Sequence, residues 1–171
     1  MIYECCNLDD FNEKVDIIIT NGTLEHLYEP GEILRKFQLI LNTDGLIYVT
    51  CPHFYNLRGF IWVTLNKLFE VPMSLTDLHN ITPSDMEKWA NEAGFQIIKQ
   101  ESYDLSRSNG DLMINDLQKR LTNALRDSKL PINKVISLLK FCKNFFQFQN
   151  KFPENLKLEG MSKFYILSHL T

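Results

Sequence analysis

Glycine is sparse in this sequence, and its spacing excludes one common kind of ligand site. The 171 residues include seven glycines, and no two of them lie closer than nine positions. A loop that holds a nucleotide at a helix N-terminus needs clustered glycines, because the backbone must approach the ligand closely. No segment of the sequence predicts such a loop.

Long apolar runs, cysteine pairs and a strong net charge are also missing. No run approaches the roughly 18 apolar residues of a transmembrane segment, and Met1–Glu4 turns polar too early for a secretion signal. The net charge of −3 gives no indication of nucleic acid as a partner. The cysteines form no CxxC pair and three lie in apolar surroundings that predict burial, which favours a reducing, cytoplasmic compartment. They are Cys5, Cys6, Cys51 and Cys142.

The clearest pattern present is a strand, a helix and a second strand. Val15–Ile19 is apolar, rich in β-branched residues and too short for a helix, which is typical of a strand buried on both faces. Pro30 suits the first position of a helix, and apolar residues then repeat at helical spacing until Asp44-Gly45 ends the helix. Leu46–Thr50 predicts the second strand. Elements in this order form a right-handed βαβ unit, and its ligands bind outside the carboxyl ends of the strands.

The elements after this unit are also indicated by local signals. Leu57–Phe69 is apolar and helix-like. Thr82-Pro83-Ser84-Asp85 predicts a capped helix start, with Gly94 just after the helix end. Phe95–Glu101 predicts a strand, and Lys163–Ser168 predicts a last, antiparallel strand. The expected fold is therefore of the α/β class.

A change in charge divides the chain. Residues 1–103 hold 7 basic and 15 acidic residues (−8), whereas residues 104–160 hold 10 and 6 (+4). Two apolar stripes predict helices in the second segment, broken near Pro131. We expect an α/β half-domain over residues 1–103, a helical insertion over 104–160 and a final strand of the sheet over 161–171.

The second helix of this insertion carries aromatic residues among lysines. Phe141, Phe145 and Phe148 alternate with basic side chains, a pattern that suits a membrane surface or single-stranded nucleic acid. The same aromatics could instead be buried against their own domain or a partner chain. The sequence leaves these alternatives open.

Several short motifs together resemble a known family. They are Leu24-Glu25-His26-Leu27, Glu29-Pro30, Asp44-Gly45, Cys51-Pro52, Leu78–Thr82 and Ala93-Gly94-Phe95. Combined, they resemble the carboxy-terminal half of a class I S-adenosylmethionine-dependent methyltransferase, similar to the quinone-biosynthesis and sugar methyltransferases. The family's glycine-rich cofactor loop and the strands on either side of it have no counterpart. The resemblance implies a partial Rossmann-like sheet, S-adenosylmethionine as cofactor, and a small molecule or glycan precursor as methyl acceptor.

The resemblance also implies where the cofactor would bind. The region of Asn7 and Leu8 resembles the loop beside the adenine, where the Asn7 amide oxygen could accept a hydrogen bond; a plain polar turn is the alternative. Asn21, Gly22 and Thr23 follow the first strand of the unit. In the family the pair at Glu25-His26 orders the loop around the cofactor, which makes His26 a supporting residue.

The best candidates for chemistry follow the second strand. Methyl transfer from a sulfonium mainly requires donor and nucleophile to be held in line, and a general base helps when the acceptor is a hydroxyl or amine. His53 comes directly after Cys51-Pro52 and is the preferred base, with Tyr55 beside it; an exposed loop histidine is the alternative. For Leu57–Phe69 the alternatives are a lid over the substrate, a helix on the core, or a contact with a lipidic surface.

A metal site is not expected. Glu25-His26 and His79 resemble the metal ligands of methyltransferases that act on small-RNA 3′ ends. Those enzymes carry a further Glu three residues before the first, where this chain has Gly22. One ligand of the set is therefore missing.

These observations lead to two expectations of different kinds. The first is a truncated or split methyltransferase, inactive as an isolated chain, that needs a companion half-domain or self-associates through an unpaired first strand. The second is a non-catalytic interaction protein derived from a methyltransferase. The wide spacing of the glycines argues against a third hypothesis, a complete enzyme with an unusual cofactor loop.

Overall fold

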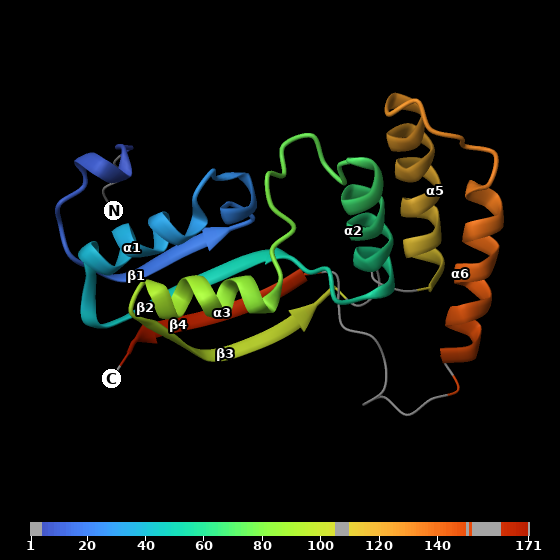
Figure 1. Ribbon diagram of the computed structural model, residues 1–171. Helices are drawn as coiled ribbons and strands as arrows, with labels where there is room; N and C mark the ends of the chain where they lie inside the picture. The colour runs from blue at the N-terminus through green and yellow to red at the C-terminus, as the bar shows by residue number, and fades with distance from the viewer. Residues whose placement is uncertain (1–4, 105–109, 150, 152–161, 171) are drawn as a thin grey trace. The chain divides into compact units, whose positions relative to one another are not determined.

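A computed structural model describes residues 5–104, 110–149, 151 and 162–170 (Figure 1). The chain divides into two compact units. Of the described residues, the sheet unit comprises 5–51, 81–101 and 164–170, and the helical unit comprises 52–80, 102–104, 110–149, 151 and 162–163. Each unit is therefore assembled from segments that are distant in the sequence.

The sheet has four strands, namely β1 (Val15–Asn21), β2 (Leu41–Pro52), β3 (Phe95–Tyr103) and β4 (Ser162–His169). Their spatial order is β1-β2-β4-β3. The β1 and β2 strands are parallel, and β4 runs opposite to both of its neighbours (Figure 1). The predicted parallel pair and the antiparallel last strand are confirmed, and within the described residues β1 and β3 form the two edges.

Two helices cover one face of this sheet. They are α1 (Pro30–Ile40) and α3 (Pro83–Glu92), joined at their surface by an Arg35–Glu92 ion pair of 3.4 Å. The α3 start is the predicted one, because Thr82 and Asp85 form a reciprocal capping box. The core between helices and sheet contains Leu34, Ile47, Val49, Cys51, Met86, Ala90, Phe95, Tyr165 and Leu167.

The predicted helix end at Asp44-Gly45 is wrong. The α1 helix ends at Ile40, and β2 begins at the next residue. The register pairs Val15 with Leu41 but Ile17 with Leu46, so β2 carries extra residues in a bulge at this point. A Cβ atom at Gly45 would lie 2.7 Å from the Leu41 side chain. Gly45 is therefore required by the local backbone, but it marks a bulge in β2 and not the end of a helix.

The prediction that the first strand is buried on both faces is also wrong. Ile18 packs against the core, but Ile17 and Ile19 on the other side of β1 are 57% and 74% exposed. The α1 and α3 helices cover only one face of the sheet. The apolar run is thus half covered within the described residues.

The helical unit contains α2 (Leu57–Phe69), α5 (Gly110–Asp127) and α6 (Val135–Gln149). The α5 and α6 helices come between β3 and β4 in the chain, which confirms the helical insertion before the last strand. A second core lies among these helices and contains Ile61, Trp62, Val71, Met113, Leu117, Leu121, Val135, Leu139, Cys142 and Phe146.

Polar contacts fix α2 against α5. The buried Arg58 guanidinium lies 3.0 Å from an Asp116 carboxylate oxygen, and the Arg120 guanidinium lies 5.8 Å from the Trp62 ring centre. Of the three proposed roles for Leu57–Phe69, packing on a core is the one observed, although the core is that of the helical unit. The chain segment 53–78 therefore groups with the insertion helices and not with the sheet.

The aromatic residues of α6 divide between core and surface. Phe146 is buried and Phe145 packs against the second core, whereas Phe141 and Phe148 are 63% and 59% exposed. Across the described residues, no helix is both long and apolar enough to cross a lipid bilayer.

Replacing Leu34 by alanine should destabilise the sheet unit strongly. Leu34 is fully buried between α1 and the sheet, so we expect the free energy of unfolding to fall by about 2–5 kcal/mol. Leu39→Ala is the matched control, because Leu39 lies on the same helix and is 69% exposed; its effect should stay within about 0.5 kcal/mol. Urea unfolding followed by circular dichroism measures both, and equal losses would contradict the packing described.

Candidate functional site

The carboxyl end of β1 is tied to β2 by a hydrogen-bonded turn. The Gly22 amide donates to the Thr50 carbonyl oxygen (3.0 Å) and lies 3.2 Å from the Thr50 hydroxyl. The Thr50 hydroxyl donates in turn to the side-chain oxygen of Asn21. Gly22 has φ +56°, in the region that favours glycine. Both the Gly22 amide and the Asn21 side chain are therefore engaged within the protein.

A short 3₁₀ helix, η2 (Leu24–His26), follows this turn. The backbone amide of His26 donates to the Thr23 carbonyl oxygen (3.0 Å). Glu25 is buried. A Cβ atom added to Gly22 would lie 3.5 Å from one of the Glu25 carboxylate oxygens. His26 is exposed. Asn21, Gly22, Thr23 and His26 thus lie in one local region.

Asn7 and Leu8 lie elsewhere in the sheet unit. Asn7 caps η1 (Leu8–Asp10) without a side-chain hydrogen bond, and Asp9 forms an ion pair with Lys36 of α1. Figure 1 shows this dark blue segment at the amino end of β1, opposite the arrowhead. Seven residues of strand span roughly 23 Å. The structure therefore does not bring Asn7 and Leu8 together with the turn at Gly22.

His53 and Tyr55 lie in the helical unit, just before α2. His53 is 2% exposed, and its ring centre lies 5.8 Å from that of Tyr55 with the rings tilted by 58°. The alternative of an exposed loop histidine is therefore wrong. Tyr55 itself is 55% exposed.

The backbone beside His53 is held by Asn56. The Asn56 amide nitrogen donates to the His53 carbonyl oxygen (2.9 Å), and its side-chain oxygen accepts from the Gly59 amide (2.8 Å). Asn56 is buried and is the N-cap of α2. A Cβ atom at Gly59 would lie 2.3 Å from the Phe54 backbone. This close approach fixes how the chain carrying His53 enters the helix.

The cysteines offer no nucleophile at these positions. Cys51 and Cys142 are buried and Cys5 and Cys6 are exposed, so the prediction that three would be buried is wrong. Burial raises the pKa of the Cys142 thiol, which keeps it in the unreactive protonated form. The described part of the chain contains no group of three or more His, Cys, Asp or Glu side chains arranged to hold a metal ion.

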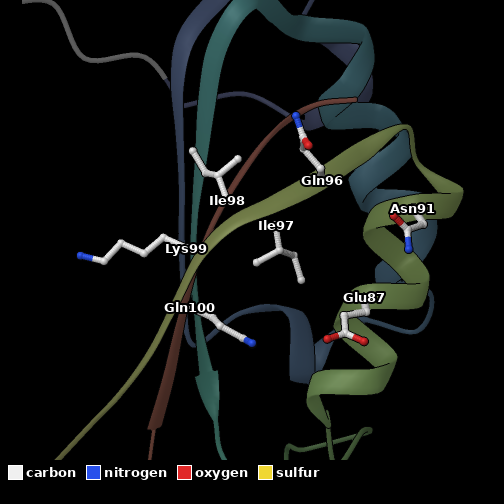
Figure 2. A pocket seen from close by; sticks show the side chains of 7 residues that line it. All are labelled: Glu87, Asn91, Gln96, Ile97, Ile98, Lys99 and Gln100. Carbon is white, nitrogen blue, oxygen red and sulfur yellow. The ribbon is translucent and has the colours of Figure 1, made fainter. Parts of the chain in front are cut away.

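A shallow hollow of about 330 Å³ lies between α3 and the edge strand β3 (Figure 2). Glu87 and Asn91 of α3 face it from one side, and Gln96–Gln100 of β3 line the other. None of the predicted site residues takes part. Its strand lies at the opposite edge of the sheet from the turn at Gly22.

Thr50 is a site residue that sequence reasoning missed. It stands opposite Asn21 in the β1–β2 register. A polar residue at the carboxyl end of the second parallel strand is a usable signal, because these strand ends meet at one edge. Its partner could be identified only once the register was known.

The comparisons with known proteins establish the family. Residues 4–100 match the family described as a methyltransferase domain, and the chain belongs to this family. It is 22% identical over 125 residues to the ubiquinone biosynthesis O-methyltransferase of Glaesserella parasuis serovar 5 (strain SH0165), covering 66% of this chain and 52% of that protein. The chain thus spans about half the length of the curated relative it matches.

Solved structures show the same fold. A SAM-dependent methyltransferase from Archaeoglobus fulgidus is similar with a TM-score of 0.52 and 12% identity, over 94% of this chain and 62% of that one. The [4+2]-cyclase SpnF is similar with a TM-score of 0.50 and 13% identity, over 98% and 56%. The partial Rossmann-like fold and the class I methyltransferase resemblance are confirmed. Since one of these proteins is a cyclase, the fold alone does not decide the reaction.

The resemblance indicates S-adenosylmethionine as the cofactor. The residues present account for only part of the site that would bind it. The sequence has no glycine-rich loop. The turn that remains at the carboxyl end of β1 directs the Gly22 amide and the Asn21 side chain to Thr50. The described residues therefore do not form a complete site for the cofactor.

Replacing Thr50 by valine should loosen this turn. The variant loses the hydroxyl that bonds Asn21 and Gly22, at an expected cost of about 1 kcal/mol in the free energy of unfolding. Thr43→Val is the control on the same strand, because Thr43 is exposed and lies in the bulge, away from the turn. Urea unfolding of the two variants should differ by that amount. If they are equally stable, the turn does not depend on the hydroxyl.

Proposed function

We propose that this chain is one part of an S-adenosylmethionine-dependent methyltransferase that acts on a small molecule or glycan precursor and is inactive in isolation. The observation that carries the proposal is the commitment of the Gly22 amide and Asn21 side chain to Thr50, in a chain without clustered glycines. The family membership supports the reaction class. The resemblance to a ubiquinone biosynthesis O-methyltransferase supports a small acceptor.

The proposed roles follow from chemistry and position. His53 is the general base for the acceptor's hydroxyl or amine, and Tyr55 beside it contacts the acceptor. Asn21, Gly22, Thr23 and His26 form the part of the cofactor site that this chain contributes. The contact of Asn7 and Leu8 with the adenine of the cofactor stays a prediction. It requires the segment before β1 to take a different position in an assembled enzyme.

A non-catalytic interaction protein is the second candidate. It is favoured by the large apolar side chains that remain exposed on strands and helices, including Ile19 and Phe141. For either candidate we propose a cytoplasmic location, because all four cysteines are free thiols.

The isolated chain should not bind S-adenosylmethionine with useful affinity. Without a glycine-rich loop, the backbone cannot approach the cofactor. Isothermal titration calorimetry with the purified chain should show no dissociation constant below ~100 μM, which corresponds to about −5.5 kcal/mol. A complete methyltransferase titrated under the same conditions is the positive control. Tighter binding would revive the complete-enzyme interpretation.

His53 can be tested in an enzyme completed by a segment that carries the glycine-rich loop. In that assembly His53→Ala should lower kcat by about 10²–10⁴-fold, because a base on the acceptor contributes that much. Cofactor affinity should be nearly unchanged. His79→Ala is the matched control and should retain turnover. Unchanged turnover in His53→Ala, with the fold intact by circular dichroism, would remove His53 from the mechanism.

A further inference from the structure

The helical unit contains a hollow that the residues of the proposed function do not use. It has a volume of about 370 Å³ and lies between the chain that follows α2 and the last turns of α5. All of its lining residues, which include Pro72, Met73, Leu75, Arg120 and Ala124, belong to this one unit. Pockets for small molecules have volumes of about 300–1,000 Å³, so the hollow is large enough for such a ligand.

One wall of the hollow is held in place by two arginines. The Arg120 guanidinium of α5 donates a hydrogen bond to the Met73 carbonyl oxygen (3.0 Å), and the Arg58 guanidinium of α2 donates to the Met73 sulfur (3.5 Å). Just beyond Met73, the side-chain hydroxyls of Ser74 and Thr76 lie 3.1 Å apart. These contacts form the wall without help from a ligand, and small-molecule sites are usually preformed in this way.

Arg120 brings a positive charge to the hollow. It forms no ion pair with any residue that the structure describes, and its contacts are the Met73 carbonyl and the face of the Trp62 ring. The acidic residue of the lining, Asp127, forms an ion pair with Arg126 (2.9 Å). A guanidinium carries five N–H donors in a planar fork that matches a carboxylate. Only one of these donors is used by Met73, so Arg120 can still hold an anion.

Leu75 gives an independent indication of a ligand. Its side chain is 96% exposed, which makes it the most exposed large apolar residue in the described part of the chain. It lines the hollow together with Pro72 and Ala124. A ligand with an apolar body would remove these side chains from water, and this burial would favour binding.

These features select the chemistry of the ligand. An apolar wall beside one guanidinium without a counter-ion fits a molecule with a hydrocarbon or aromatic body and a single negative charge. A phosphate monoester carries about −1.5 to −2 charges, so one arginine would not neutralise it. A carboxylate carries one charge and accepts two parallel N–H bonds from a guanidinium.

We propose that this hollow binds a small amphipathic carboxylate. The carboxylate pairs with the Arg120 guanidinium, and the apolar body packs against Pro72, Leu75 and Ala124. The inference does not rest on the proposed function, because no residue assigned to the cofactor or to the general base lines the hollow.

The test uses octanoate as the probe and octanamide as its neutral counterpart of the same shape. Isothermal titration calorimetry on the full chain should show one saturable site for octanoate, and octanamide should bind at least ~10-fold more weakly, because hydrogen bonds between charged groups are the stronger ones. Arg120→Gln should weaken octanoate binding about 10- to 100-fold and remove the preference over octanamide. Lys119→Gln is the matched control. It removes the same charge from the adjacent, exposed position of α5, outside the hollow, and should change neither affinity.

Leu75→Ala locates the ligand without disturbing the fold. Because Leu75 is exposed, the variant should keep its circular dichroism spectrum and its unfolding temperature. Octanoate and octanamide should both bind about 3- to 10-fold more weakly, since part of the apolar contact is lost. If Arg120→Gln does not fold, this variant and the preference of the wild-type chain for octanoate still test the site.

Several results would overturn the proposal. One is the absence of a saturable octanoate site with a dissociation constant below ~1 mM. Equal affinities of the wild-type chain for octanoate and octanamide would show that Arg120 does not recognise an anion. Octanoate binding that Leu75→Ala leaves unchanged would place the ligand elsewhere. An equal loss of affinity in Lys119→Gln and Arg120→Gln would show an unspecific attraction between charges.

Discussion

The parallel pairing of β1 with β2 is the interaction on which the rest of the sheet unit depends. Its register decides that Ile18 and Ile47 face the helices, while Ile17 and Leu46 face away. A shift by one residue would exchange the two faces and turn the covered residues outward. The same register brings Asn21 beside Thr50, where the turn that begins at Gly22 is closed. Core packing and the geometry of the candidate site therefore have one common origin.

Much of the fold could be predicted because its signals are local. The capping box at Thr82 and the apolar spacing of Leu57–Phe69 lie within single elements, and both describe the structure correctly. The bulge at Gly45 could not be predicted, because it depends on which residues of β1 stand opposite. The exposure of Ile17 could not be predicted either. An apolar strand indicates that both faces are meant to be covered, but it does not say which part of the chain, or which other molecule, provides the cover.

The candidate site was harder to predict than the fold, for a related reason. Neighbours in sequence such as His53 and Tyr55 were identified from their place after a strand, and the rings do lie close together. Thr50 was missed because its partners Asn21 and Gly22 are about 30 residues away and depend on strand register. Asn7 was assigned by resemblance to proteins about twice as long. This chain matches only about half of such a protein. The position of the Asn7 loop, which depends on contacts with the other half, therefore cannot be inferred by analogy.

The position of β4 between β2 and β3 has a consequence for how the chain acquires its structure during synthesis. The ribosome produces β2 and β3 long before residues 162–169 emerge, and a chain grows by about 5–20 residues per second. Until then, β2 and β3 have no strand between them, and the core of the sheet unit lacks Tyr165 and Leu167. Contacts between distant segments also form slowly. For several seconds after β3 has been synthesised, the inner edges of β2 and β3 therefore have no native partner strand to pair with.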